Sequence, residues 1–152
     1  MQTVFNKVKE EFGWLGNMAP YPINYENQIW RTSEALFQAM RFDDPEIREI
    51  IRKEKSPMGA KMKAKFFREN MSIEPMSDID VKNMKKCIKL KFDQHADIKR
   101  KLIETGKSEI IEDIGTRNGV RHKFWGAKRY NENQFEGQNV MGKLLMELRD
   151  EL

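Results

Sequence analysis

Glu34 is placed where a carboxylate could act as an acid or a base. Thr32 or Ser33 can cap a helix that starts here, so Glu34 would lie in its first turn. Phe37 and Gln38 follow one turn later, and an aromatic ring and an amide can desolvate and orient a carboxylate. On pattern alone, a surface glutamate that interacts with the helix dipole is the commoner arrangement. Glu34 is therefore a candidate catalytic residue with a structural alternative.

A second group of chemically capable side chains occurs in residues 119–130, GVRHKFWGAKRY. Its aromatic rings could stack on a base or a ribose, and its basic side chains could contact phosphates. Its glycine would let a ligand approach the backbone. The candidates are Arg121, His122, Phe124, Trp125, Gly126 and Lys128. A core tryptophan with a flanking turn explains the same residues equally well.

The last helical segment offers a weaker candidate site at its start. Gly137 and Asn139 precede it, and a helix N-terminus can hold an anion. Simple capping by Asn139 is the favoured interpretation. Gly142 lies inside the same segment and costs about 1 kcal/mol relative to alanine, so we expect it to allow close packing against another element.

The sequence carries none of the common metal, triad or phosphate-loop patterns. His95 and His122 are not spaced as a metal pair, and neither a P-loop nor a dinucleotide fingerprint is present. The single cysteine, Cys87, lies in a lysine-rich helical segment, where burial between apolar neighbours is a better interpretation than catalysis. We expect neither a metal nor a redox cofactor.

Basic residues are concentrated in two stretches, although the net charge of the chain is only +4 and its pI about 9.1. Residues 52–68 hold seven basic side chains, among them Lys61 and Lys65, against one acid. Residues 82–91 hold five lysines and no acid. Each stretch could face a phosphate or a nucleic acid, or could simply be a solvated helix face.

The composition is that of a globular protein, with 39% hydrophobic and 34% charged residues. The length of 152 residues suits one domain spanning 1–152. No apolar run is long enough to span a membrane, and the start of the chain lacks the apolar stretch of a signal peptide. With a single cysteine, the expected compartment is the reducing cytoplasm.

The elements that would position these residues are mainly helical, which predicts an α+β fold. Turn formers and aromatic residues in the first 30 positions favour short strands. Apolar periodicity and capping residues predict the helices that follow. The expected helices cover 33–42, 45–55, 56–67, a segment around 81–89, 95–106 and 139–152. A further short strand is expected around 124–128.

Several of these segments, in this order and spacing, resemble the NADAR family, also called YbiA-like. The matching segments are WRTSEALFQA at 30–39, SPMGAK at 56–61, KFDQH at 91–95, TG at 105–106, FWGAK at 124–128 and GQNVMGKLLMELR at 137–149. Each segment is weak alone, but the combination is specific and runs over nearly the whole chain.

The resemblance implies a compact, mostly helical fold and the cleavage of N-glycosidic bonds. Some members hydrolyse early intermediates of riboflavin biosynthesis, and others remove ADP-ribose from guanine bases of nucleic acid. The family glutamate corresponds to Glu34, which favours the catalytic interpretation of that residue. The family tryptophan corresponds to Trp125, and the glycine and asparagine pair to Gly137 and Asn139.

The chain departs from the family pattern at several positions. His122 stands where most members have an aspartate, three residues before the tryptophan, and the loop that precedes it is longer than usual. Met71 replaces a family tryptophan, and Ala64-Lys65 replaces Gly-Arg. Because of these changes, a protein that binds ADP-ribose-like ligands without turnover is an alternative interpretation.

Cleavage of a C1′–N bond builds oxocarbenium character on the ribose, which Glu34 would stabilise while it activates water. His122, Arg121 or Gln38 would help the base to depart. The remaining roles follow by residue type: Trp125 and Phe124 stack the base or ribose, and Lys61, Lys65 and Lys128 contact phosphates. The expected substrate is ADP-ribosylated guanine, in DNA, RNA or a nucleoside. The alternatives are ribosylaminopyrimidine phosphates, an ADP-ribose-binding module and a basic nucleic-acid-binding protein.

Overall fold

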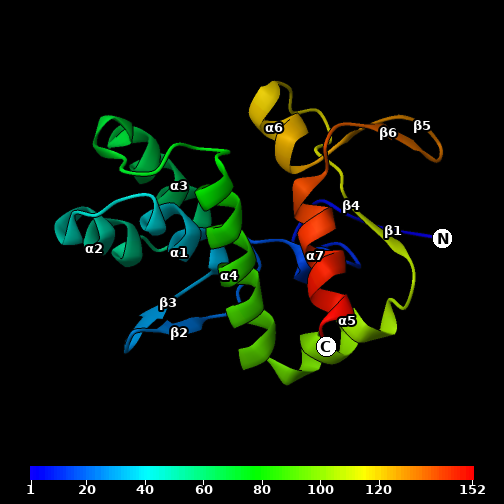
Figure 1. Cartoon of the computed structure of the whole chain (residues 1–152), viewed down its shortest axis with the longest axis horizontal. Coiled ribbons are helices and arrows are strands. Elements are labelled where there is room, and N and C mark those ends of the chain that lie inside the picture. Colours follow the sequence, from blue (N-terminus) through cyan, green and yellow to red (C-terminus); the bar gives the residue numbers. More distant parts are fainter. The chain divides into compact units, whose positions relative to one another are not determined.

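The computed structural model describes residues 1–152, and the chain forms two units by its internal contacts. The central unit is Asn17–His95, and the terminal unit comprises Met1–Gly16 and Ala96–Leu152. Figure 1 labels their helices and strands along the chain. Helices predominate and the strands are short, which confirms the expected α+β class.

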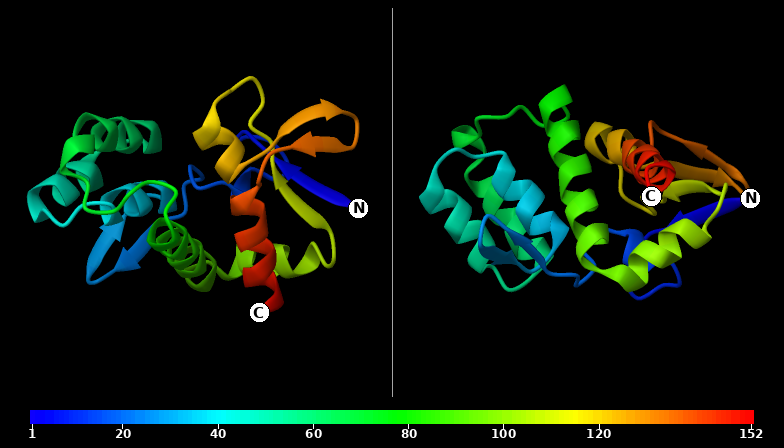
Figure 2. Two further views of the ribbon diagram at one scale, coloured as in Figure 1. Left: turned by 45° about the horizontal axis from the view of Figure 1, so that its top comes forward. Right: turned by 60° about the horizontal axis from the view of Figure 1, so that its bottom comes forward.

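The central unit is organised around helix α1. Its elements are β2 (Ile23–Tyr25), β3 (Gln28–Trp30), α1 (Ser33–Met40), α2 (Pro45–Lys53), α3 (Pro57–Phe66), the 3-10 turn η2 (Arg68–Asn70) and α4 (Asp78–Gln94). Helices α2, α3 and α4 and strand β3 all contact α1, as the views in Figures 1 and 2 agree. Every residue of α1 except Glu34 is buried.

The helices of the central unit begin where the sequence places capping residues. The Thr32 hydroxyl accepts a hydrogen bond from the Ala35 amide at 3.1 Å and so fixes the start of α1. Side chains of Asp44, Ser56 and Ser77 cap the other three helices in the same way. The helices expected at 33–42, 45–55 and 56–67 are confirmed, with ends that differ by one or two residues.

The terminal unit is built on a parallel pair of strands, in which Thr3 faces Ile110. Its elements are β1 (Gln2–Phe5), the 3-10 turn η1 (Gly13–Leu15), α5 (Ala96–Glu104), β4 (Glu109–Glu112), α6 (Val120–Trp125), β5 (Lys128–Asn131), β6 (Gln134–Glu136) and α7 (Val140–Asp150). Helix α7 packs on β4, and β5 and β6 form an antiparallel hairpin.

Gly142 allows the close contact between α7 and β4. A Cβ atom at this position would come within 2.1 Å of the Ile110 carbonyl oxygen. The expectation that Gly142 marks close packing against another element is therefore confirmed.

Two local expectations in the terminal unit are corrected by the structure. The strand expected around 124–128 begins only at Lys128 as β5, because Phe124 and Trp125 end α6 and Ala127 forms only an isolated β-bridge. Asn139 precedes α7 as expected, but its side chain does not cap the helix. The residue adopts a left-handed conformation, with φ of 51°, and its amide bonds to β4.

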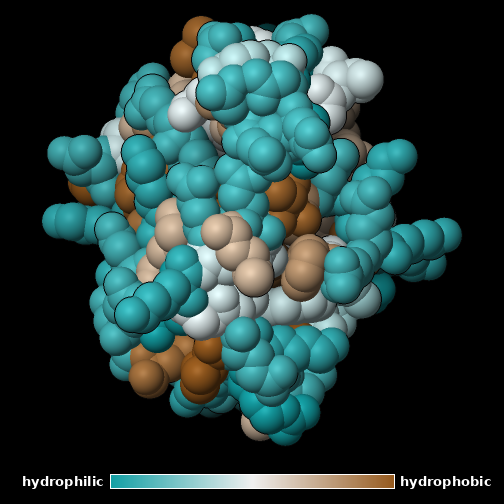
Figure 3. All heavy atoms as spheres, turned by 90° about the vertical axis from the view of Figure 1, so that its right-hand side faces the viewer, coloured by the Kyte–Doolittle hydropathy of each residue, from teal (hydrophilic) through white to brown (hydrophobic).

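The surface matches the high charge content of the sequence. On the face shown in Figure 3, hydrophilic residues predominate and apolar residues appear in small separate groups. Cys87 is completely buried, as expected from its apolar neighbours. The structure contains no helix with both the length and the apolar character that a membrane span requires.

Candidate active site

Glu34 is the single residue of the central helix α1 that reaches the surface. It occupies the first turn, where the positive end of the helix dipole stabilises a carboxylate. Its backbone amide donates to the Asn17 carbonyl at 3.1 Å, and the neighbouring Ser33 hydroxyl donates to the Asn17 side chain at 2.8 Å. The backbone that carries Glu34 is thus held on both sides while its side chain remains half-buried.

A chain of hydrogen bonds runs from Glu34 into the interior of the central unit. Gln38 donates through Nε2 to Glu34 Oε2 at 2.6 Å. Arg41 donates through Nη1 to Gln38 Oε1 at 3.3 Å. Arg41 also forms a bidentate ion pair with Asp80 of α4, with distances of 2.9 and 2.8 Å. The side chains of this pair are 7% and 0% exposed, so the carboxylate of Glu34 is tied to a buried anchor.

Cys87 does not provide a nucleophile beside this network. Burial raises the pKa of its thiol well above the ordinary range, and the negative charge of Glu34 raises it further. The neutral thiol lies 3.5 Å from the Met40 sulfur, among apolar side chains. The structural interpretation of Cys87 is therefore confirmed.

The first basic stretch forms an exposed surface that we call the α3 surface, defined by Met58, Lys61, Met62, Lys63, Lys65 and Phe66. Ala60 and Ala64 are buried on the opposite side of the helix. Lys65 is exposed and Lys61 is half-buried. Phe66 is 76% exposed and contacts Phe67 edge to face. A groove of about 280 Å³ lies beside it, lined by Glu54, Gly59, Met62, Lys63 and Phe66.

The second basic stretch is not one exposed face, because Lys91 is completely buried. Lys82, Lys86 and Lys89 are exposed on α4. Lys86 donates to the Tyr25 hydroxyl at 3.0 Å, and Lys89 pairs with Asp93 at 3.0 Å. Lys91 therefore belongs neither to a phosphate-facing surface nor to a solvated helix face, the two alternatives for residues 82–91.

In the terminal unit, α6 carries the aromatic and basic candidates. Trp125 and Phe124 are half-buried and meet edge to face, with ring centres 4.9 Å apart. His122 precedes Trp125 by three residues in the helix, which places the two on the same side. The exposed Arg121 lies 3.3 Å from the His122 ring nitrogen through its Nη2. Lys128 donates to Asn118 at 2.7 Å.

The segment after α6 folds back on the start of α7, which explains two glycines. A Cβ at Gly126 would approach the Glu112 carbonyl oxygen to 2.7 Å, and one at Gly137 would approach the Gly126 carbonyl oxygen to 2.6 Å. The Asn139 amide group donates to Ile110 at 2.8 Å and accepts from the Glu112 backbone at 3.0 Å. Close packing of the chain against itself therefore explains both glycines, and the approach of a ligand to Gly126 stays a prediction.

A carboxylate also lies next to the end of α6. Asp113 forms a β-bridge with Ala127, two residues beyond Trp125. Its side chain is 20% exposed and lies 4.0 Å from the Arg129 guanidinium. Asp113 therefore stays a structural alternative to His122 for the role of the family aspartate.

The structure brings the candidates together in two groups. Glu34, Gln38, Lys61 and Lys65 belong to the central unit. Arg121, His122, Phe124, Trp125, Gly126, Lys128 and Asn139 belong to the terminal unit. The sequence did not reveal the ion pair of Arg41 with Asp80. The spacing of Gln38 and Arg41 on one helix was visible, but the partner carboxylate lies 39 residues away in the sequence.

Known proteins resemble this chain in sequence and in structure. N-glycosidase YbiA from Escherichia coli (strain K12) is 34% identical over 152 residues, covering 97% of this chain and 86% of that protein. The riboflavin biosynthesis protein VVA0006 from Vibrio vulnificus is 28% identical over 149 residues, covering 97% of this chain but 38% of that protein. The NMR structure of E. coli YbiA matches 99% of this chain and 86% of its own, with a TM-score of 0.78 and 31% sequence identity.

The match extends over both units of the chain, because the sequence model of the NADAR domain covers residues 4–152. The segments that carry Glu34 and Trp125 both fall within this range. The chain therefore belongs to the NADAR family.

Proposed function

We propose that this chain removes ADP-ribose from ADP-ribosylated guanine, in nucleic acid or in a nucleoside, with Glu34 as its catalytic carboxylate. The class of reaction is that of its family: the chain is an N-glycosidase, a hydrolase that acts on N-glycosyl bonds. We propose further that residues 1–152 act as one NADAR domain, in the cytoplasm, where its buried thiol stays reduced.

The position of Glu34 is the observation that carries the proposal. Every residue of α1 except Glu34 is buried. The Glu34 carboxylate is half-exposed and is fixed by a 2.6 Å hydrogen bond from Gln38. Gln38 donates to this carboxylate and so fixes its orientation, which suits a group that stabilises positive charge on the ribose. The same carboxylate can then accept a proton from the attacking water.

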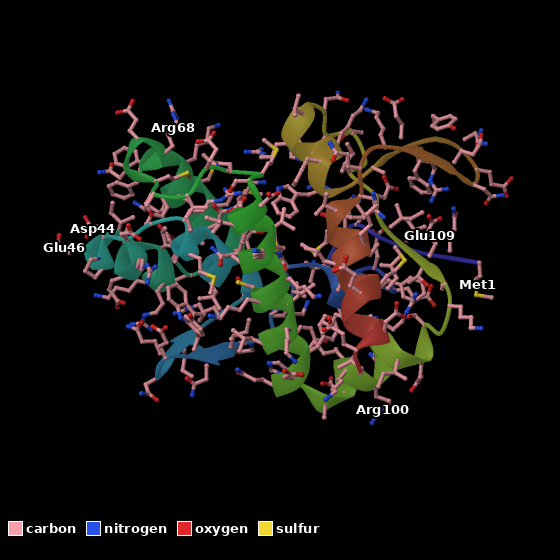
Figure 4. All side chains as sticks on the ribbon, in the orientation of Figure 1. Met1, Asp44, Glu46, Arg68, Arg100 and Glu109 are labelled. Atoms are coloured by element: carbon pink, nitrogen blue, oxygen red, sulfur yellow. The ribbon has the colours of Figure 1, made fainter.

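The choice of a polyanionic substrate rests on the α3 surface. Arg68 follows α3, and its side chain points away from the ribbon (Figure 4). An exposed phenylalanine among lysines suits a base that stacks while its phosphates contact cations. We assign Lys61 and Lys65 to phosphate contacts. We assign Trp125 and Phe124 to stacking, and Arg121, His122 and Lys128 to the leaving base and its phosphates.

A second candidate substrate is favoured by the name of one relative. The riboflavin biosynthesis protein from V. vulnificus matches nearly all of this chain, which spans less than half of that protein. Ribosylaminopyrimidine phosphates contain the same kind of C1′–N bond and a phosphate. They would use Glu34 in the same way and need fewer basic residues.

A turnover panel with a matched catalytic variant tests the proposal. Wild type and Glu34→Gln are incubated with ADP-ribosylated guanosine, ADP-ribosylated DNA and the ribosylaminopyrimidine phosphates, and products are identified by mass spectrometry. We expect wild type to release ADP-ribose, and Glu34→Gln to be folded but slower by about 10²–10³-fold. Near-normal turnover by the folded variant would contradict the role of Glu34. Turnover of the pyrimidine phosphates alone would make them the substrate.

A further inference from the structure

The Arg41–Asp80 ion pair forms the interior end of the hydrogen-bond chain that starts at Glu34. Arg41 and Asp80 are too deeply buried to meet a substrate, at 7% and 0% side-chain exposure. We propose that they are positioning residues, which act through Gln38 to hold the Glu34 carboxylate in its reactive orientation. This inference rests on the proposed function of Glu34 as the catalytic carboxylate.

The Arg41–Asp80 ion pair is the anchor of this hydrogen-bond chain. Asp80 accepts both bonds of the Arg41 guanidinium, at 2.9 and 2.8 Å, and a third from the Met76 backbone amide at 2.8 Å. The Phe37 ring lies 4.6 Å from the guanidinium carbon. A bidentate pair with these additional contacts has one orientation, because the planar fork of arginine matches both carboxylate oxygens.

The Gln38 amide lies between Arg41 and Glu34 in one defined orientation. A guanidinium can only donate hydrogen bonds, so the atom that faces Arg41 must be the oxygen of Gln38. The amide nitrogen is then turned toward Glu34, where it donates at 2.6 Å. If the amide were reversed, its oxygen would face the carboxylate and its nitrogen would face another donor. Arg41 thus helps to hold the amide in the orientation in which Glu34 receives a donor.

A positioning role and a purely stabilising role of the ion pair have different consequences for catalysis. A buried ion pair is often no better for stability than apolar residues of similar volume. The pair could nevertheless act only to join α1 to α4. In that case, loss of the fork would change stability and leave the rate constant of the folded protein unchanged. If the pair orients Gln38, loss of the fork must lower the rate constant in the folded protein.

The test is a double-mutant cycle on turnover of ADP-ribosylated guanosine, with Gln38→Met, Arg41→Lys and the double variant. Lysine keeps the charge at position 41 but cannot bond both Asp80 and Gln38 with a fixed fork. We expect each single variant to lower kcat by about 10- to 100-fold with little change in KM, as for a misplaced catalytic group. The double variant should match the slower single variant, because both changes disrupt one chain of contacts.

Arg149→Lys is the matched control. Arg149 is a partly buried arginine in the terminal unit, and it donates to Thr105 at 2.9 Å and to the Ser108 carbonyl at 2.8 Å. Its replacement removes a guanidinium with two bonds to the protein and none to the Glu34 network. We expect it to lower the melting temperature and to leave kcat unchanged.

The possible results separate the inference from the function on which it rests. Normal kcat in folded Arg41→Lys, or losses that multiply in the double variant, would overturn the positioning role even if Glu34→Gln is inactive. If Glu34→Gln retains full turnover, the proposed function itself fails. Should Arg41→Lys not fold, Asp80→Asn replaces it, since asparagine keeps the shape of the side chain and removes the carboxylate that fixes the Arg41 fork. Full kcat in that folded variant would also overturn the inference.

Discussion

Lys91 is completely buried, although lysine is one of the residues least often found inside a protein. Its Nζ lies 5.4 Å from the centre of the Tyr21 ring and 5.3 Å from that of Phe92. Burial disfavours the charged form and lowers the pKa of Lys91 to about 7. Lysine in the unfolded chain has a pKa of about 10.4. The unfolded chain therefore binds more protons than the folded chain at pH values between the two pKa values.

The pH dependence of stability follows from this difference. Where the unfolded state holds the extra proton, the free energy of unfolding rises with pH. The cost of burying the charge is complete below the folded pKa of about 7 and disappears as pH rises toward the unfolded value. Lys91→Met should remove this rise and stabilise the protein at neutral pH, on the order of 1 kcal/mol or more. Urea unfolding at about pH 7 and about pH 9.5 measures it.

Lys89→Met is the control for this prediction, because Lys89 is an exposed lysine on the same helix with a surface ion pair. Surface pairs contribute about 0–1 kcal/mol, so this variant should keep the pH dependence of wild type. If both variants show the same slope, the titration of Lys91 is not the cause.

His122 and Asp113 give two different chemistries for departure of the base. An imidazole titrates near neutrality and can donate a proton there, whereas a carboxylic acid ordinarily cannot. If His122 is the acid, His122→Ala should lower kcat by about 10²–10⁴-fold and abolish an ionisation near neutrality in the rate profile. Asp113→Ala should then have little effect. A silent His122→Ala with a damaging Asp113→Ala would assign the role to the carboxylate instead.

At the level of secondary structure, two helical glycines have opposite surroundings. A Cβ at Gly142 of α7 would lie 2.1 Å from the backbone oxygen of Ile110, which cannot move without displacing β4. A Cβ at Gly59 of α3 would meet the flexible end of the Glu54 side chain at 2.8 Å. Alanine gains about 1 kcal/mol of helix propensity at either position. The overlap decides the sign at Gly142, because backbone is harder to displace than a side chain.

We therefore expect Gly142→Ala to destabilise the protein by about 1–3 kcal/mol or more, and Gly59→Ala to be neutral or stabilising. Thermal unfolding of the two variants gives the comparison directly. Equal melting temperatures would show that α7 can shift away from β4 at little cost.

Some secondary-structure elements have local signals in the sequence, and others do not. Helices α1 to α3 follow local signals, since Thr32, Asp44 and Ser56 cap them and prolines open two of them. Strand β4 has no such signal. Its four residues pair with β1 in parallel, and that pairing joins segments from opposite ends of the chain. Local patterns do not report a pairing of this kind, which explains why β4 was missed.

The candidate site divides in the same way. Glu34 shares one helix turn with Gln38, so their contact could be anticipated, but only the resemblance to the family favoured a catalytic role for Glu34. Asp80 and Lys91 could not be identified, because each is a charged residue in a polar stretch whose burial depends on tertiary packing. Asn139 was assigned a helix cap from its position, but its amide pairs with β4, a strand that the sequence did not reveal.

At the level of the whole molecule, the distribution of charge matters more than the net charge of +4. Acidic residues are almost absent from residues 52–68, and the one present, Glu54, lies 3.9 Å from Lys63. The exposed cations of this stretch, Lys53, Lys55, Lys65 and Arg68, can contact a polyanion. A mononucleoside substrate would contact few of them, whereas a longer nucleic acid would contact several at once.

This difference predicts how salt affects the two kinds of substrate. Each phosphate contact to a single strand contributes about −0.7 to the slope of log affinity against log salt. Between about 50 and 200 mM salt, kcat/KM for an ADP-ribosylated oligonucleotide should therefore fall steeply, and that for ADP-ribosylated guanosine should fall little.

Lys65→Gln should reduce the salt slope measured with the oligonucleotide by about 0.7, since it removes one phosphate contact. Lys107→Gln, an exposed lysine of the terminal unit, should leave it unchanged. Phe66→Ala should raise KM for the oligonucleotide without altering its salt slope, because stacking releases no counterions. Identical salt slopes for the oligonucleotide and the nucleoside would show that the α3 surface does not contact nucleic acid during turnover.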